Sequence, residues 1–281
     1  MNQQVAPSRM LALGDADYPA GLCALADAPQ RLFVRGGPLP ACERAVAIVG
    51  ARAATPYGRG VAERLARDLA HAGLTVVSGL ARGIDAAAHA GALAAPGRTV
   101  AVIPSALDSV TPRTHAALAE RIAGSGAVVS EVAEGGPFGR GAFVKRNRLI
   151  AAMAAVTVVV EAAPESGALT TAAAARALGR VVLAVPGDVD RPGSRGTLAL
   201  LREGSRPCAN AGDVFAVLGP LATADDPEAR LRGLLDRSPR SVDDLARASG
   251  GQAGETLARL LRLEWSGLAL AHPGGRWSGR A

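Results

Sequence analysis

The feature that most constrains the fold of this 281-residue chain is an alternation of two kinds of segment. Between residues 41 and 218, short apolar runs alternate with stretches in which apolar side chains recur every three or four positions. The runs are typical of strands buried on both faces, and the recurring pattern is typical of amphipathic helices. Repeated strand-helix units predict a doubly wound, Rossmann-like α/β domain with a mostly parallel sheet.

The first unit shows this pattern clearly. The run Arg44–Gly50 predicts a strand, and Thr55 followed by Pro56 predicts the N-cap and first residue of a helix that ends at Gly73. Further strands are predicted within residues 74–80, 98–105, 127–132, 156–162 and 180–188, with a helix following each of the first four. These units account for the segment that we assign to the Rossmann-like domain, residues 41–218.

The remaining segments divide the chain further. We expect residues 1–40 to be a short, partly ordered lead-in and residues 219–226 to be a linker. Residues 227–281 show three short helical patterns and then two short strand patterns, which is typical of a winged-helix domain. The helical patterns lie at about Glu228–Asp236, Val242–Ala248 and Ala253–Leu263, and the strands flank Pro273-Gly274-Gly275.

The charge of the chain is positive and unevenly placed. The formal net charge is +6 and the isoelectric point is about 10.2, which favours a polyanionic partner unless the arginines are simply scattered over the surface. Residues 225–281 hold 9 basic and 8 acidic side chains, whereas the central domain holds 19 and 14. The excess therefore lies on the Rossmann-like domain.

Other features restrict the cellular setting. Cys23, Cys42 and Cys208 are far apart in sequence, which argues against a disulfide framework or a zinc site. The longest apolar stretch, Leu149–Val160, is too short for the ~20 residues of a membrane span. The chain opens without a signal-peptide pattern. We therefore expect a cytoplasmic protein with no membrane insertion and no metal.

Ligands of open α/β sheets bind where strands end and helices begin. At the first such turn, Gly50 allows a tight turn, Arg52 presents a fork of donors, and Thr55 with the helix N–H groups can hold an anion. The turn matches neither the G-x-G-x-x-G pattern nor a Walker A loop. A dinucleotide site and ATP hydrolysis are therefore disfavoured, and no cofactor is expected.

The second turn has the sequence S-G-L-A-R-G. Gly79 and Gly83 allow close backbone approach, and Arg82 between them is either a second phosphate contact or a partner of Asp85. Asp85 is expected to cap the following helix and to pair with Arg82 or His89. An Asp–His pair suggests acid–base chemistry, but the sequence places no nucleophile beside it, so no catalytic residue is assigned.

The third turn carries a cluster of positive side chains and no acid: Arg140, Lys145, Arg146 and Arg148. Lys145 is the only lysine in the chain. Cations at a helix N-terminus oppose the helix dipole, so their clustering favours an anion as partner. Phe143 beside them is suited to stacking on a base, or else to packing in the core.

A fourth turn contains Ser166-Gly167 and Thr170-Thr171, which present hydroxyls and amides or simply cap a helix. Because the carboxyl ends of parallel strands share one edge of a sheet, these turns are expected to lie side by side. The first three together predict a track for successive phosphates.

The order of these motifs resembles that of the DNA-processing family DprA, also called Smf. The shared motifs span about residues 15–280: V-A-I-V-G-A-R with T-P-Y-G, S-G-L-A-R-G-I-D-A-A-A-H, V-V-S-E, F-x-x-R-N-R-L-I-A, S-G-A-L-T-T-A and A-V-P-G. Residues at matching motif positions are Gly50, Arg52, Thr55, Tyr57, Gly58, Ser78, Gly79, Arg82, Gly83, Phe143, Arg146, Asn147, Arg148, Ser166 and Gly167. Lys145 falls at a variable position of its motif, so its DNA contact is inferred from charge alone.

The resemblance implies a non-enzymatic protein that binds single-stranded DNA independently of sequence. It further implies protection of incoming DNA, dimerisation through the Rossmann-like domain, and loading of RecA recombinase during natural transformation. An alternative is a Rossmann-like enzyme or sensor for a small nucleotide, although the phosphoribohydrolase motif P-G-G-x-G-T-x-x-E is missing. Another is duplex reading by the winged helix. On the first interpretation, removal of Arg52 or Arg146 weakens DNA binding and its salt dependence.

Overall fold

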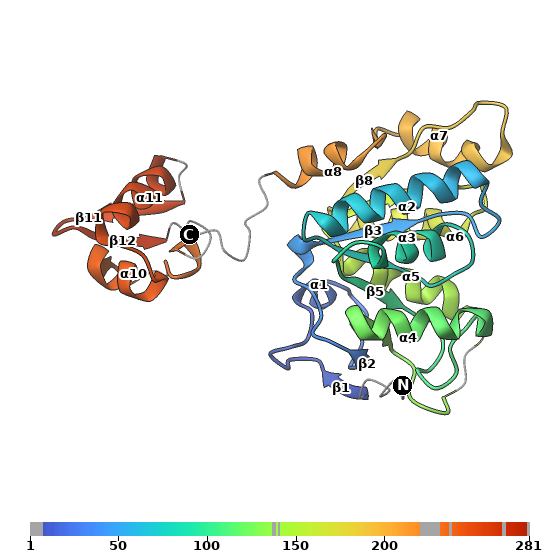
Figure 1. The fold of residues 1–281 in the computed structure, drawn as a ribbon, viewed down its shortest axis with the longest axis horizontal. Helices are drawn as coiled ribbons and strands as arrows, with labels where there is room; N and C mark the ends of the chain where they lie inside the picture. The colour runs from blue at the N-terminus through green and yellow to red at the C-terminus, as the bar shows by residue number, and fades with distance from the viewer. Residues whose placement is uncertain are drawn as a thin grey trace. The chain divides into compact units, whose positions relative to one another are not determined.

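The structure is a computed structural model that describes residues 8–136, 139, 141–219, 231–235, 238–265 and 268–279. Arg140, most of the expected linker at 219–226 and the start of the first winged-helix pattern lie outside these ranges. The chain divides into two compact units, residues 1–219 and 220–281 (Figure 1).

A nine-stranded sheet forms the centre of the larger unit, in the order β1-β2-β6-β5-β4-β3-β7-β8-β9. From β6 to β9 all neighbouring strands are parallel, as the Rossmann-like prediction required. These strands are β3 (Ala45–Val49), β4 (Thr75–Ser78), β5 (Thr99–Val102), β6 (Ala127–Ser130), β7 (Val156–Val159), β8 (Val181–Ala184) and β9 (Arg206–Pro207). The mostly parallel, doubly wound fold is thus confirmed.

Helices cover both faces of this sheet (Figure 1). Successive strand residues face opposite ways, and all residues of β3 to β7 are buried, so both faces must be covered. One face packs on α1, α5 and α6 through a core that includes Ala47, Val129 and Ile150. The other face packs on α4 through a core that includes Ala101 and Ile122. The helices of this unit are α1 (Ala20–Cys23), α2 (Pro56–His71), α3 (Ile84–Leu93), α4 (Ala116–Ser125), α5 (Ala142–Ala152), α6 (Gly167–Ala177), α7 (Arg195–Arg202) and α8 (Ala211–Leu218). Among the helices described, none is long and apolar enough to cross a membrane.

Strands β1 (Ser8–Ala12) and β2 (Arg31–Gly36) extend the sheet at its β6 edge, both in antiparallel pairing. They come from the segment expected to be a partly ordered lead-in, so that part of the chain is more structured than its sequence suggested. Leu32 and Val34 are fully buried, whereas Arg31 is exposed and Phe33 and Arg35 are half-buried. In the sequence, however, Leu32-Phe33-Val34 is a short apolar run, because Phe33 packs against the core on the opposite face of the sheet.

The strand order reverses between β3 and β7, which follow each other in the sheet but not in the sequence. At such a switch point the loops leaving the carboxyl ends of the two strands diverge and leave a crevice. The turns after β3, β4, β5, β6, β7 and β8 therefore share one edge of the larger unit, called here the carboxyl edge.

The smaller unit contains α10 (Val242–Ser249), α11 (Ala253–Trp265) and a sheet of β10 (Arg240–Ser241), β12 (Arg276–Gly279) and β11 (Ala269–His272). Its core joins Leu245, Leu260 and Trp277. The two helices and the hairpin around residues 273–275 occur where the winged-helix pattern predicted them. Of the first predicted helix only residues 231–235 are described.

Candidate nucleic-acid interface

The turns after β3 and β4 and the start of α5 meet at the carboxyl edge. The amide of Ile84 donates to the carbonyl of Ala51 at 3.2 Å, which ties the first turn to α3. Gly83 has a φ of +80°, and a Cβ there would lie 2.2 Å from the carbonyl oxygen of Ala51. Only glycine combines this backbone conformation with this close approach. Gly50 likewise packs directly against Ile84.

Arg52 is exposed on this edge and lies over the ring of Phe143, with its guanidinium carbon 4.7 Å from the ring centroid. No carboxylate among the described residues forms an ion pair with Arg52. A cation over an aromatic face contributes about 0.5–1 kcal/mol at an exposed site and holds the side chain in place. The half-buried Phe143 therefore supports Arg52 and is not simply part of the core.

Arg82 is the second exposed cation of the edge. It forms no ion pair or hydrogen bond with any residue that the structure describes, so its expected pairing with Asp85 is not present. Positive charge held without a carboxylate partner beside Gly83 is available to an anion from solution.

Arg146 lies in a different environment from the one predicted. It is 4% exposed, and its guanidinium donates to the carbonyls of Gly79 and Val102 at the ends of β4 and β5. A Cβ on residue 79 would lie 2.4 Å from the guanidinium, so glycine makes room for it. Burial lowers the pKa of Arg146 to about 10, which still leaves it charged at neutral pH. Arg146 thus joins two strand ends and is not an exposed phosphate ligand.

Asp85 completes this buried group. Its carboxylate accepts hydrogen bonds from the amides of Gly79 at 3.1 Å and Ala81 at 3.3 Å. Burial raises the pKa of Asp85, while the charge of Arg146 and the two amides act in the opposite direction. Asp85 therefore holds the backbone of the second turn through the amides of Gly79 and Ala81. It is not bonded to its predicted partners, Arg82 and His89.

His89 is fully buried and bonds elsewhere. Its Nδ1 lies 2.7 Å from the hydroxyl of Thr99, which itself donates to the carbonyl of Val76. Because the Thr99 hydrogen is already used, His89 Nδ1 must be the donor of this pair. Burial lowers the pKa of His89 to about 3, so the imidazole is neutral. Its position excludes contact with a substrate in solution.

Asn147 was also predicted to face DNA, but it is 9% exposed and spans two helices. Its amide donates to the carbonyl of Gly167 at 3.0 Å and to the hydroxyl of Thr170 at 2.8 Å. Ser166 caps α6 by accepting from the amide of Ala168, which is the simpler of its two predicted roles. Asn147 thus anchors the fourth turn against α5, and Gly167 remains exposed on the edge.

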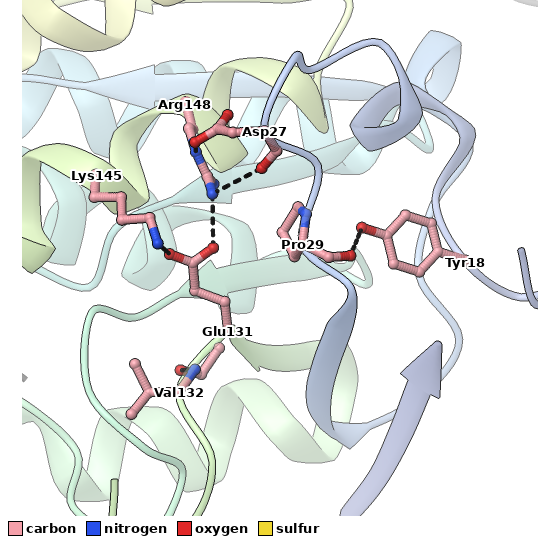
Figure 2. Close-up of polar contacts among 8 residues, drawn as sticks. Tyr18, Asp27, Pro29, Glu131, Val132, Lys145 and Arg148 are labelled. Atoms are coloured by element: carbon pink, nitrogen blue, oxygen red, sulfur yellow. Dashed lines mark hydrogen bonds and ion pairs between the residues drawn. The ribbon is translucent and has the colours of Figure 1, made fainter. Parts of the chain in front are cut away.

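Arg148 and Lys145 are both held by carboxylates, as Figure 2 shows. Arg148 binds Asp27 at 2.7 Å and Glu131 at 2.8 Å, and its side chain is 14% exposed. Lys145 binds the other oxygen of Glu131 at 3.2 Å but remains 61% exposed. The predicted phosphate role of Arg148 is therefore not supported, because two acids already neutralise it. Tyr18 stabilises the same region by donating to the carbonyl of Pro29 at 2.7 Å.

The start of α2 already has an anion in place. The Glu161 carboxylate, which follows β7, accepts from the Thr55 amide at 2.9 Å and from the Thr55 hydroxyl at 2.5 Å. Thr55 in turn accepts from the amide of Gly58, where a Cβ would lie 2.3 Å from the Glu161 carboxyl carbon. An external phosphate at this helix start, as predicted for Thr55 and Gly58, would compete with Glu161. Tyr57 is 58% exposed beside it.

Ser78 is the last of the predicted site residues, and it is fully buried. Its hydroxyl donates to the carbonyl of Ile48 on the neighbouring strand at 2.6 Å. It therefore contributes to the sheet and not to a ligand.

Two cavities flank these turns. One, of about 660 Å³, lies between the β1–β2 connection, the turn after β6 and α5, and its lining includes Asp27, Glu131, Lys145 and Arg148. The other, of about 380 Å³, lies at the ends of β7 and β8 and is lined by Tyr57, Glu161 and Arg191 among others. The exposed residues Arg52 and Arg82 follow β3 and β4, which lie between the two cavities in the strand order of the sheet.

Sequence reasoning did not assign the three acids that shape the edge. Glu161 could have been recognised because it directly follows a buried strand at the switch point, where polar side chains meet ligands. Glu131 likewise directly follows a buried strand, β6, whereas Asp27 carried no such signal, since its partner Arg148 lies 121 residues away in the chain.

Known family models match the sequence of each of the two units. The model described as DNA recombination-mediator protein A matches residues 9–219, and the model described as DprA winged helix domain matches residues 218–275. A structure of DNA processing protein A from Streptococcus pneumoniae superposes with a TM-score of 0.71 at 35% identity, covering 78% of this chain and 76% of that one. For the Helicobacter pylori protein, whose structure concerns its single-stranded DNA binding mode, the TM-score is 0.66 at 29% identity, covering 76% and 96%.

Curated relatives show the same similarity in sequence. DNA processing protein DprA of Mycobacterium tuberculosis is 43% identical over 249 residues, which cover 83% of this chain. The chain spans 64% of the length of that relative. Protein Smf of Escherichia coli is 35% identical over 288 residues, covering 96% of this chain and 77% of that protein. With one family model covering most of the larger unit and a second covering the smaller one, the chain belongs to the DNA recombination-mediator protein A (DprA) family.

Proposed function

We propose that this protein binds single-stranded DNA independently of sequence, at the carboxyl edge of the larger unit. One observation carries the proposal: Arg52 and Arg82 are exposed on neighbouring turns, neither pairs with a carboxylate in the part of the chain that the structure describes, and Arg52 is held over the ring of Phe143. Cations beside an aromatic ring suit a strand whose phosphates are neutralised and whose bases are free to stack. The H. pylori relative, whose structure concerns single-stranded DNA binding, supports the same ligand.

The wider role follows from family membership. We propose that the protein is not an enzyme, that it acts as a homodimer, and that it protects incoming DNA and transfers it to RecA during transformation. Buried His89 and the carboxylate-bound Arg148 are consistent with a binding role, since neither is available for chemistry on a bound strand. Sedimentation analysis of the free protein tests the dimer, and RecA filament assembly on protein-coated strands tests the transfer.

The DNA-binding proposal is tested by fluorescence anisotropy of a labelled oligo-dT, of about 15 nucleotides to match a typical single-strand site. The same assay is run on a duplex of equal length for comparison, and at several salt concentrations. We expect tight, salt-dependent binding that favours the single strand and is not displaced by dTMP. Equal affinity for the duplex, or displacement by dTMP, would contradict the proposal and favour a nucleotide enzyme or sensor.

Removal of one edge cation provides the residue-level test. Arg52→Ala is expected to weaken oligo-dT binding roughly tenfold and to lower the salt slope by about 0.7, the value for one phosphate contact on a single strand. Arg64→Ala is the matched control, because it removes the same charge from an exposed position further along α2. Equal effects of the two substitutions would mean that only net charge matters.

A further inference from the structure

The second turn, after β4, contains a backbone conformation that its sequence does not favour. Leu80 has a φ of +57°, and among the residues that the structure describes it is the only one other than glycine with a positive φ. A residue with a Cβ is disfavoured in this left-handed region, so the surrounding structure must hold it there. Leu80 is fully buried in the core that includes Ile103 and Ile122, whereas Arg82, two positions on, is exposed. The conformation of Leu80 therefore sets the path of the chain from this core to Arg82.

Two buried side chains hold the start of this turn. The Asp85 carboxylate accepts from the amides of Gly79 and Ala81, and the Arg146 guanidinium donates to the carbonyl of Gly79 at 2.6 Å. Both side chains lie inside the larger unit, since Asp85 is 5% exposed and Arg146 is 4% exposed. They fix the backbone on either side of Leu80 and leave its own carbonyl to another partner.

His115 binds that carbonyl from a different segment of the chain. The residue ends the short helix Arg113–His115 between β5 and α4, and its Nδ1 lies 2.8 Å from the carbonyl oxygen of Leu80. Because a carbonyl oxygen only accepts, Nδ1 carries the hydrogen and donates it. The Leu80 carbonyl and the Ala81 amide belong to one trans peptide group, whose C=O and N–H point in opposite directions. His115 and Asp85 therefore hold this peptide plane from its two ends.

We propose that His115 is a positioning residue of the DNA interface: it fixes the Leu80–Ala81 peptide and thereby directs Arg82 to the strand. Without this donor, rotation about the bonds on either side of the peptide lets Leu80 leave the left-handed region, and Arg82 loses its fixed place. The contact with DNA rests on the proposed function, whereas the hold on the turn does not. His115 carries no signal for this role in the sequence, since its partner lies 35 residues away.

Two replacements of nearly the same shape separate the donor from simple packing. Asparagine places its Nδ2 donor where the imidazole has Nδ1, whereas leucine has the same branching without a donor. His115→Leu is expected to weaken oligo-dT binding as much as Arg82→Ala does, roughly tenfold, and to lower the salt slope by about 0.7 for one lost phosphate contact. His115→Asn is expected to keep both values. Equal losses in the two variants, or unchanged binding in His115→Leu, would overturn the proposal.

A double variant determines whether His115 acts through Arg82. If it does, His115→Leu has no further effect on oligo-dT affinity once Arg82→Ala is present, so the two changes are not additive. His71→Leu is the matched control, because it removes a histidine from an exposed position at the end of α2 and should leave affinity and salt slope unchanged. Losses that add in the double variant would mean that His115 does not work through Arg82, which contradicts the positioning role.

Amide hydrogen exchange measures the state of the turn without DNA. The Ala81 amide is bonded to Asp85, and the Ile84 amide is bonded to the carbonyl of Ala51 nearby. In His115→Leu we expect Ala81 to exchange about fivefold faster, the effect of one lost hydrogen bond, and Ile84 to be unchanged. In His115→Asn neither amide should change. Equal acceleration at both amides would indicate general loosening and refute the specific hold on the turn.

The exchange measurement also separates this inference from the proposed function. Should oligo-dT not bind the wild-type protein, the proposed function fails by itself. Faster exchange at Ala81 in His115→Leu alone would then still support the hold on the turn, and unchanged exchange there would overturn it.

Discussion

At the scale of single residues, burial separates cations that look equivalent in the sequence. The motif K-R-N-R places Lys145, Arg146 and Arg148 within four positions, yet their surroundings differ. The Lys145 side chain is 61% exposed, Arg146 is buried, and Arg148 is paired with two acids. Helix α5 begins at Ala142, so Arg146 lies one turn inside it, on the face that also buries Ile150. That rotation depends on where the helix begins, which a sequence locates only to within a few residues.

Arg146→Ala is therefore expected to act on stability and not specifically on DNA. The substitution leaves the Asp85 carboxylate buried beside an empty space and removes hydrogen bonds to Gly79 and Val102. Losing the hydrogen bonds of a buried charged group costs about 2–3 kcal/mol of unfolding free energy, which urea denaturation measures. Arg82→Ala is the comparison, because its exposed side chain should change stability by less than about 0.5 kcal/mol. Similar losses in both variants would refute the structural role of Arg146.

His89 predicts the pH dependence of stability. Its pKa is lowered from 6.5 to about 3 in the folded chain, so below pH 6.5 the unfolded chain binds a proton that the folded chain does not. The stability that depends on neutral His89 is complete above pH 6.5 and is lost as the pH falls towards 3. Between pH 7 and 5, wild type should lose about 2 kcal/mol more than His89→Gln. The other titrating groups, Asp85 included, are common to both proteins, so identical pH slopes would contradict the prediction.

At the scale of elements, the sequence predicted the positions of helices and strands better than it predicted the surroundings of single side chains. All six central parallel strands, β3 to β8, and the helices between them occur where apolar runs and helical periodicity placed them. Those signals are local, because a strand buried on both faces must be apolar throughout. The pairing of β2 with β6 was not predicted, because it joins segments about a hundred residues apart and leaves only a short apolar run in the sequence.

The connection between β1 and β2 gives the prediction at this scale. Arg148 binds Asp27 in that connection and Glu131 after β6, and its side chain is 14% exposed. Arg148→Ala should lower the unfolding free energy by about 2 kcal/mol, the range for hydrogen bonds to charged groups, and should raise amide exchange around Asp27. Lys145→Ala removes a cation from the same helix and the same acid, but an exposed pair contributes less than about 1 kcal/mol. Exchange that rises equally in both variants would mean that Arg148 does not hold the connection.

At the scale of the whole molecule, the two units have separate cores and different charge. The cluster around Leu245 and Trp277 lies within the smaller unit, and the candidate site lies within the larger one. On α11, Arg259 pairs with Glu255 at 3.1 Å, and Leu257 and Leu261 are 40% and 51% exposed. Such a helix surface is poorly suited to duplex DNA, which is contacted mainly by cations and polar side chains.

A chain ending at Gly219 should therefore keep most of the affinity for oligo-dT. Sites in separate units contribute additively, so we expect a change within roughly 0.5 kcal/mol, or about twofold, in the same anisotropy assay. The full chain measured at equal salt is the reference. A much larger loss, with the salt slope reduced, would place part of the phosphate contact in the winged-helix unit.

The single lysine has a consequence for chemical labelling. Apart from the α-amino group, Lys145 carries the only primary amine of the chain, and its side chain is 61% exposed beside the cavity of about 660 Å³. An amine-reactive reagent applied to the intact protein has one side chain to modify. Acylation there would remove a positive charge from the carboxyl edge and leave Glu131 to Arg148 alone. A dye or cross-linker thus reaches a single side chain, next to the proposed DNA site, without mutation of any residue.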